Sequence, residues 1–430
     1  MVSLEIPIHK YTVIPTNLSL TIYLMRRTIE KIAGIDCILA PMQDSNSTTI
    51  QIMCRAGSHY ESAKISWIAH FIEHNFFKGG ERYKTPKAVA EALDKFWGSF
   101  NAWTGESEVA YFVKSAPAFT ENALDVLADM MMNARFPKEE LEREKGVVIQ
   151  ELKMYEDMPQ ALVAEKRQTR RYGNNNYGRS VIGIIDTIQS FTQADLFAYR
   201  NALYTKDNLI IVIAGSFDTE KIKKLIETYF TALPATKTLQ KDPFTRQLPP
   251  VHQDFFEKKT EQNHLIISAT GVNGRDDRRH AARVMTTILW GNMSSRLFQN
   301  IREKQGLCYY IRARHESAPE YGDFYIRAGI DKARFDFGVE KIYAEIADIA
   351  NGNITEEEFH NAKTCIAGNL QMGIETSDQM VNFLGSQYLH YGEIKTLEQQ
   401  LADIEKVTFD QVCEAAKMLN KENLYLYWIQ

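Results

Sequence analysis

His70, Glu73 and His74 lie within five consecutive residues, His70-Phe71-Ile72-Glu73-His74. Residues four apart share one face of a helix, so both imidazoles can reach the same metal ion. Glu73 flanks that face, where a carboxylate can take a proton from a water molecule that the ion activates. The pattern indicates metal-assisted hydrolysis, although a helix with two incidental histidines remains an alternative, because only three positions are fixed.

A second acidic stretch lies farther along the chain. Glu144 and Glu151 are seven residues apart, so two helical turns bring them onto one face. Glu151 stands among Val147, Val148, Ile149 and Leu152, which predicts a partly buried carboxylate. Such a carboxylate needs a cation or hydrogen-bond donors nearby. An acidic helix face that is merely solvated is the alternative for the other glutamates of this stretch.

The H-x-x-E-H pattern is the inverted zinc-peptidase motif. Followed by Glu151 after 76 residues, it resembles the pitrilysin/insulinase/mitochondrial-processing-peptidase family of zinc endopeptidases. Residues 57–61 and 77–79 also look like that family. The resemblance implies one Zn2+ per chain and a role for five residues: the metal ligands His70, His74 and Glu151, the general base Glu73, and the supporting carboxylate Glu144.

Two further stretches are similar to elements of the same family. Residues 98–104 look like its substrate-pairing strand, with Asn101 and Ala102 as the substrate-binding candidates. An edge strand can bind an extended peptide through main-chain hydrogen bonds, whereas the plain alternative for Asn101 is a turn residue. Arg302 and Tyr309 match an Arg/Tyr element that, in the family, holds the substrate and stabilises the tetrahedral intermediate. Trp67 departs from the family pattern, and its bulk could narrow the substrate groove.

The chain is predicted to be a duplicated α+β protein. Its 430 residues fit two or three domains, and a proline-rich stretch at residues 231–250 reads as an extended linker. Residues 206–213 resemble 421–428, and residues 139–145 resemble 357–363, at offsets of 215 and 218. We therefore expect a zinc-bearing domain at 1–230, the linker at 231–250, and a homologous domain at 251–430. Two generic helix–strand units are the alternative to a duplication.

Local patterns predict the elements that position these residues. We expect a strand at residues 47–54, a helix over about 63–78 that carries the motif, and a helix that begins at Pro86. Thr192 and Thr408 are typical of helix N-caps. In the second half, the positions that correspond to the motif and to Glu151 hold Val284, Thr287, Ile288 and Asn369, so no second metal site is expected.

Composition excludes several other classes of protein. A formal net charge of −5 argues against a nucleic-acid-binding surface. No apolar run approaches the ~20 residues that a membrane helix needs. The five cysteines are odd in number and never form a CxxC pair, which argues against a disulfide framework and a thiolate zinc site. Without a secretory leader pattern at the start, a reducing, cytoplasmic location is the simplest expectation.

The resemblance implies a zinc-dependent metalloendopeptidase that cleaves unfolded peptides or flexible segments. Family members of this length dimerise and enclose a chamber, so a homodimer is expected. A catalytically silent subunit is one alternative. A peptidase that is active only as a heterodimer with a non-identical chain is another. The presence of both the motif and the Arg/Tyr element in one chain favours the homodimer.

Overall fold

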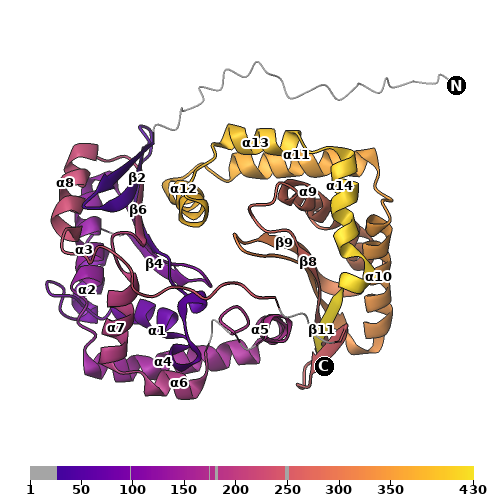
Figure 1. Ribbon diagram of the computed structural model, residues 1–430, viewed down its shortest axis with the longest axis horizontal. Helices are drawn as coiled ribbons and strands as arrows, with labels where there is room; N and C mark the ends of the chain where they lie inside the picture. The colour runs from indigo at the N-terminus through magenta and orange to yellow at the C-terminus, as the bar shows by residue number, and fades with distance from the viewer. Residues whose placement is uncertain (1–26, 97, 174, 180–182, 247–250) are drawn as a thin grey trace.

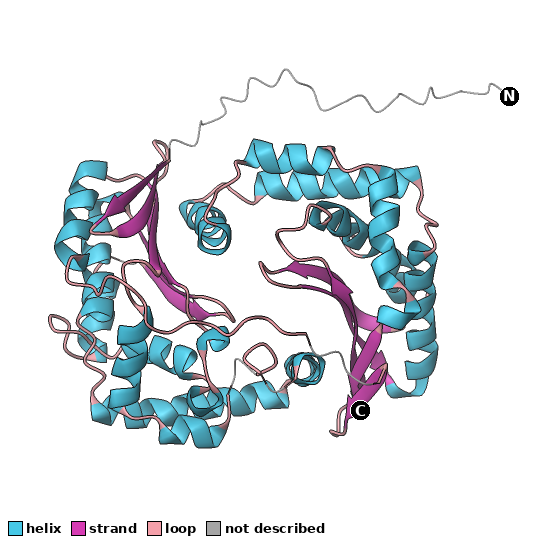
Figure 2. Ribbon diagram, in the orientation of Figure 1, coloured by secondary structure: helices cyan, strands magenta, loops and turns pink. Residues whose placement is uncertain are grey.

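The computed structural model describes residues 27–96, 98–173, 175–179, 183–246 and 251–430. These residues form two halves, each a β-sheet covered by helices on its outer side (Figures 1 and 2). The two sheets lie on the inner sides of the halves, toward the middle of the molecule. The predicted α+β fold in two halves is therefore confirmed.

The first half contains a six-stranded sheet in the order β1-β2-β6-β3-β5-β4. Its strands are β1 (Thr28–Ile32), β2 (Ile35–Pro41), β3 (Thr48–Cys54), β4 (Ser99–Thr104), β5 (Val109–Ser115) and β6 (Leu209–Gly215). Its helices are α1 (Ile68–Phe76), α2 (Pro86–Asp94), α3 (Thr120–Met132), α4 (Lys138–Asp157), α5 (Pro159–Tyr172), α6 (Ile185–Ser190), α7 (Gln193–Leu203) and α8 (Thr219–Phe230). Strand β4 pairs only with β5, so it is the edge strand that residues 98–104 were predicted to form.

The second half contains a five-stranded sheet in the order β7-β11-β8-β10-β9. Its strands are β7 (Gln253–Phe256), β8 (Gln262–Gly271), β9 (Cys308–Ser317), β10 (Gly322–Asp331) and β11 (Tyr425–Ile429). Its helices are α9 (Arg279–Leu289), α10 (Phe335–Ala350), α11 (Glu356–Met372), α12 (Ser377–Tyr391), α13 (Leu397–Glu405) and α14 (Phe409–Ala416). The helix pair α9 and α11 repeats the packed pair α1 and α4 of the first half.

The repeat includes the helix that precedes the last strand of each half. Helix α7 begins at Thr192 and α14 begins at Thr408, and each threonine forms a capping box with the third residue of its helix. Both predicted N-caps are thus confirmed. In α9, the positions that correspond to the motif include Val284 and Ile288, which are buried in an apolar core.

Each half supplies one helix to the sheet of the other half (Figure 1). Helix α12 lies on β3 and β6, where Val381 and Leu384 pack against Ile210 and Val212. Helix α5 lies on β8 and β11 in the same way. This exchange joins the halves through apolar burial, which is the dominant favourable contribution to folding.

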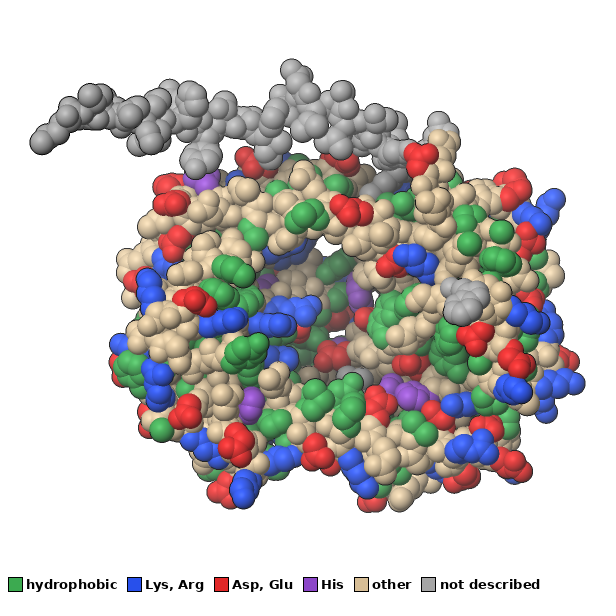
Figure 3. Space-filling view, turned by 180° about the vertical axis from the view of Figure 1, so that it is seen from behind, with side chains coloured by type: hydrophobic (Ala, Val, Ile, Leu, Met, Phe, Trp, Pro, Cys, Tyr) green, Lys and Arg blue, Asp and Glu red, His purple; other side chains and the backbone are tan. Residues whose placement is uncertain are grey.

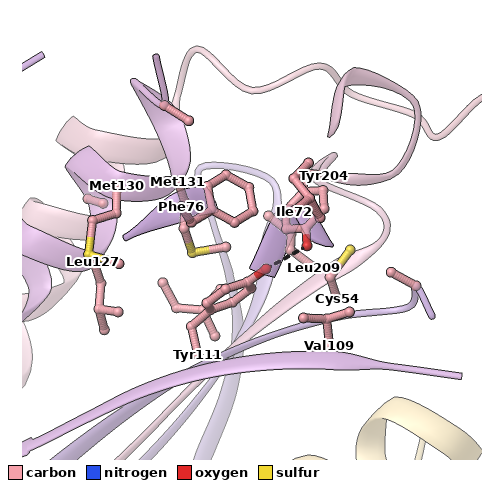
Figure 4. Close-up of a cluster of buried hydrophobic side chains, with 14 of the residues drawn as sticks. Cys54, Ile72, Phe76, Val109, Tyr111, Leu127, Met130, Met131, Tyr204 and Leu209 are labelled. Carbon is pink, nitrogen blue, oxygen red and sulfur yellow. Dashed lines mark hydrogen bonds between the residues drawn. The ribbon is translucent and has the colours of Figure 1, made fainter. Parts of the chain in front are cut away.

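A buried core behind α1 fixes the position of the motif (Figure 4). Ile72 and Phe76 of α1 are fully buried with Tyr111 of β5 and Tyr204. The hydroxyls of the two tyrosines lie 2.8 Å apart and hydrogen-bond to each other, which satisfies two polar groups inside this core. The side of α1 that carries the histidines therefore faces away from the core.

Three local predictions can be compared with the structure. The strand at β3 and the helix start at Pro86 are confirmed. The motif helix begins at Ile68 rather than near residue 63, because Trp67 has a left-handed backbone with φ 82°.

Residues 231–246 form neither helix nor strand, as expected for the linker, and Pro249 and Pro250 lie outside the described residues. None of the helices in the described ranges has the length and apolar run that crossing a bilayer requires.

Candidate metal centre

The start of helix α1 is held by a buried carboxylate. Glu61 accepts hydrogen bonds from the backbone N–H groups of Trp67, at 2.6 Å, and Ala69, at 2.9 Å. These donors belong to the first turn, which has no intrahelical acceptors for them. Gly183 approaches the Trp67 side chain so closely that a Cβ there would lie 2.6 Å from the indole. The helix that carries the histidines therefore begins at a fixed place and angle.

His70, His74 and Glu151 converge from helices α1 and α4. The Nε2 atoms of the two histidines are 3.2 Å apart. The Glu151 carboxylate oxygens lie 3.8 Å from Nε2 of His70 and 3.5 Å from Nε2 of His74. Ligand atoms about 2.0–2.1 Å from a tetrahedral zinc ion lie about 3.3 Å apart, so this donor set fits such an ion with one position left open. In the described part of the chain, these three residues form the one cluster of this kind.

Glu144 orients His74 from the side opposite Glu151. The Nδ1–H of His74 donates to Oε1 of Glu144 at 2.9 Å, a tautomer assigned from the hydrogen-bond network. The Lys78 ammonium lies 2.5 Å from the other oxygen of Glu144. Burial alone would raise the pKa of Glu144, but these two partners hold it below its usual value. With Nδ1 occupied, Nε2 of His74 is directed toward His70 and Glu151.

The two histidines have opposite pKa shifts. Burial and the neighbouring His74 lower the pKa of His70 to about 4, so its imidazole is neutral. Burial also acts to lower the pKa of His74, but hydrogen bonds to Glu144 and Glu151 raise it to about 9. The hydrogen bond from His74 in turn lowers the pKa of Glu151. Glu144 and Glu151 thus flank His74, and acidic partners of this kind stabilise a positively charged imidazole.

Glu73 lies beside the three convergent residues and not among them. Its carboxylate accepts a hydrogen bond from the Thr104 hydroxyl at 2.6 Å, at the end of β4. Burial raises the pKa of Glu73, although the Thr104 hydrogen bond acts in the opposite direction. A carboxylate with a raised pKa in a cavity is suited to accept and later release a proton.

These groups lie in a cavity of about 640 Å³ between α1, α4 and the edge strand β4. The lining includes Asn101 and Ala102, the two substrate-binding candidates, and also Trp67, which is 1% exposed. The Asn101 side chain accepts a hydrogen bond from the backbone N–H of Ala102. The cavity therefore joins the candidate metal ligands to an unpaired sheet edge.

The Arg/Tyr element, Arg302 and Tyr309, lies outside the metal cavity. Arg302 is in a π-helical turn, Phe298–Glu303, and Tyr309 is at the start of β9. The Arg302 guanidinium is 5.5 Å from the centre of the Tyr309 ring, so the two side chains are neighbours. Tyr309 is 82% exposed, and neither residue is among those that line the cavity of the described chain.

Sequence reasoning missed the roles of Glu61, Lys78 and Thr104. Thr104 could have been found, because side chains alternate along a strand and Thr104 shares a face with Ala102. Glu61 and Lys78 stand in stretches that resemble the family, residues 57–61 and 77–79, but nothing in their spacing indicates which groups they contact.

The comparisons with known proteins agree with the geometry. A family model described as insulinase (peptidase family M16) matches residues 38–184, and a model described as the peptidase M16 inactive domain matches residues 190–365. An uncharacterized zinc protease of Bacillus subtilis, YmxG, is 32% identical over 91% of this chain and 95% of its own length. An uncharacterized zinc protease of Rickettsia felis is 30% identical over 90% of this chain and 93% of its own.

The fold is shared with solved structures of much lower sequence identity. The crystal structure of a protease from Helicobacter pylori superposes with a TM-score of 0.85 at 18% identity, and the match covers 95% of this chain and 100% of that one. At such identity the likeness shows the fold alone. The family follows from the relatives that match over nine-tenths of its length: the chain belongs to the insulinase family, peptidase family M16.

Proposed function

We propose that this chain is a zinc-dependent metalloendopeptidase in which His70, His74 and Glu151 hold the ion. The observation that carries the proposal is the near-tetrahedral spacing of their ligand atoms, 3.2 to 3.8 Å, beside the Glu73 carboxylate. The names of the relatives as zinc proteases support the choice of metal. When bound, zinc would supply a Lewis acid that polarises the scissile carbonyl and lowers the pKa of water.

Glu73 moves the proton in this mechanism. Its carboxylate takes a proton from the attacking water and later delivers it to the leaving amine. Thr104 holds one oxygen of Glu73 through the 2.6 Å hydrogen bond and so fixes the direction of the carboxyl group. Burial, which raises the pKa of Glu73, brings its proton affinity closer to neutral pH.

The substrate is an extended peptide that lies along β4. This strand has a neighbour on one side only, and its residues Asn101 and Ala102 line the cavity. Main-chain hydrogen bonds along the free edge would bind a peptide with little demand on its sequence. Folded proteins, whose backbone is already paired, would be excluded, whereas unfolded peptides and flexible segments would be accepted.

A homodimer completes the site in this proposal. Arg302 and Tyr309 lie outside the cavity of their own chain, and the Tyr309 side chain is almost fully exposed. These features support an arrangement in which the same two residues of a second copy reach the substrate. They equally favour the second candidate, a peptidase that needs a non-identical partner, because either partner would present such residues at the cavity.

The test is hydrolysis of a quenched fluorescent peptide library by the purified chain, with and without a chelator, beside Glu73→Gln. We expect chelator-sensitive cleavage that falls roughly 10²- to 10⁴-fold in the variant while zinc content is unchanged. Glu139→Gln, an exposed glutamate on α4, is the matched control. Zinc without cleavage would favour the partner-dependent candidate, and a chain with neither would be a silent subunit. Unchanged turnover by Glu73→Gln would overturn the mechanism.

A further inference from the structure

A second cavity, of about 610 Å³, lies in the other half of the molecule. It is formed by the start of α9, the end of β9, the end of α12 and the loop that follows α12. Four cationic side chains line it, against two carboxylates, those of Asp277 and Glu393. The four are Arg275, Arg279, Arg283 and Lys395.

Three of these cations have no carboxylate partner. In the described ranges, no ion pair involves Arg275, Arg279 or Arg283, and the Arg279 guanidinium reaches only a backbone carbonyl, at 3.4 Å. Arg278, next in sequence to Arg279 but outside the cavity, does have a partner, because it lies 2.7 Å from Asp276. Arg279 and Arg283 are four residues apart in α9 and Arg275 lies just before that helix, so three unpaired positive charges gather at one cavity.

The electrostatic surroundings agree with an excess of positive charge. Burial and then the positive charge of Arg279 lower the pKa of His280, a further lining residue, to about 4. A guanidinium group pairs with a carboxylate through two parallel N–H···O hydrogen bonds, so a carboxylate is the ligand that these unpaired arginines favour.

This cavity and the metal cavity are joined by a short chain of contacts. Trp103, which lines the metal cavity, packs against the apolar cluster formed by α12 on the first sheet. His390 of α12 lies 3.7 Å from Glu108, in the turn after β4, and the next residue, Tyr391, lines the basic cavity. In the space-filling view the molecule is hollowed between its halves, and Lys and Arg side chains gather on the wall formed by the second half (Figure 3).

We propose that the basic cavity is a substrate subsite for carboxylates, so that the chain prefers peptides with acidic residues at a distance from the bond that is cut. This inference rests on the proposed function, because it places one part of a peptide on β4 and another on α9. Bidentate pairing of guanidinium with carboxylate supplies the contact. The subsite sets selectivity among peptides and does not take part in bond cleavage.

The kinetic test compares matched peptides that differ only in a short run of glutamates or of glutamines, moved stepwise away from the cut bond. The wild-type chain should show a KM at least about fivefold lower for the acidic peptide at one range of spacings. Arg283→Gln should abolish most of this ratio, whereas Arg278→Gln, which removes the same charge from a position outside the cavity, should keep it. Equal ratios in the two variants, or no acidic preference in the wild type, would overturn the subsite.

A binding measurement separates this proposal from the peptidase itself. Fluorescence anisotropy of the labelled acidic and neutral peptides is measured with the Glu73→Gln chain, with and without Arg283→Gln. Tighter binding of the acidic peptide, lost with Arg283→Gln, supports the subsite even where no peptide is hydrolysed and the proposed function fails. Peptides with a free or an amidated C-terminus show whether side-chain or terminal carboxylates are bound. Equal binding of acidic and neutral peptides overturns the subsite whatever the activity.

Discussion

Glu144 of helix α4 lies 2.9 Å from Nδ1 of His74 on helix α1, and its other oxygen contacts Lys78. One carboxylate thus fixes the tautomer and the direction of an imidazole without approaching the other two candidate ligands. The two acidic residues thus contact opposite sides of the His74 ring, since Glu151 approaches Nε2 and Glu144 contacts Nδ1.

Glu144→Gln should lower zinc affinity by about 10- to 100-fold, because a neutral amide orients His74 less firmly and leaves Lys78 without its partner. Competition with a zinc-binding dye measures the affinity. Glu139→Gln on the exposed side of the same helix should leave it unchanged. Equal zinc affinities for Glu144→Gln and the wild type would show that Glu144 does not support the site.

Thr104→Val should shift the acid limb of the pH–activity profile to higher pH. The hydrogen bond from Thr104 lowers the pKa of Glu73, so its loss raises that pKa further, and the carboxylate form needed for proton transfer is reached only at higher pH. The profile of kcat/KM against pH reports the change, with zinc content as the control. A profile that loses amplitude but keeps its acid limb would contradict this coupling.

Asp323→Asn should destabilise the chain by about 3–5 kcal/mol, because it leaves two buried guanidinium groups uncompensated. Asp323 on β10 pairs with Arg167 and, at 3.1 Å, with Arg171, both from α5 of the other half. Asp254→Asn, which removes the partner of the exposed Arg170 on the same helix, should cost no more than about 1 kcal/mol. Urea unfolding of the three chains measures the difference. Similar losses in the free energy of unfolding for both variants would mean that burial adds nothing to the contribution of the Asp323 ion pairs.

Acid should weaken the fold through Glu106, in the turn between β4 and β5. Burial alone would raise its pKa, but contacts with His59, Tyr321 and Gln168 lower the pKa to about 2. A lowered pKa contributes stability that is present above the ordinary value of 4.5 and is lost as pH falls toward 2. Glu106→Gln should therefore unfold at a lower denaturant concentration at neutral pH, and the gap should narrow as the pH is lowered. A gap that is the same at every pH would exclude this linkage.

The proposed dimer has a direct physical check. Light scattering at working concentration should give a mass near twice 49.3 kDa. Tyr309→Ala should lower hydrolysis without changing zinc content if a second copy supplies this residue, because the residue does not line the cavity of its own chain. A monomeric mass with full activity would exclude the dimeric chamber.

The convergence of His70, His74 and Glu151 could be predicted from the sequence, because helical spacing brings the two histidines together and the resemblance adds the glutamate. The start of α1 could not, because it depends on Glu61 and on Gly183, which is far away along the chain. The sequences of α5 and α12 do not say which sheet each helix covers, because packing between the two halves is not a local property of the chain. For the same reason, the distance of Arg302 and Tyr309 from the cavity of their own chain was not predictable. The domain boundaries and the roles of the site residues stay predictions.

The exchange of α5 and α12 has a consequence for synthesis on the ribosome. The first sheet is complete once β6 has been made, but its inner face stays bare until Ser377–Tyr391 leaves the exit tunnel. Until then, Ile210, Val212 and their neighbours form an apolar surface that other nascent chains or chaperones can bind. Cleavage of the finished chain within residues 231–246 should, by contrast, leave the two fragments bound to each other, because a helix of the other half covers the inner face of each sheet.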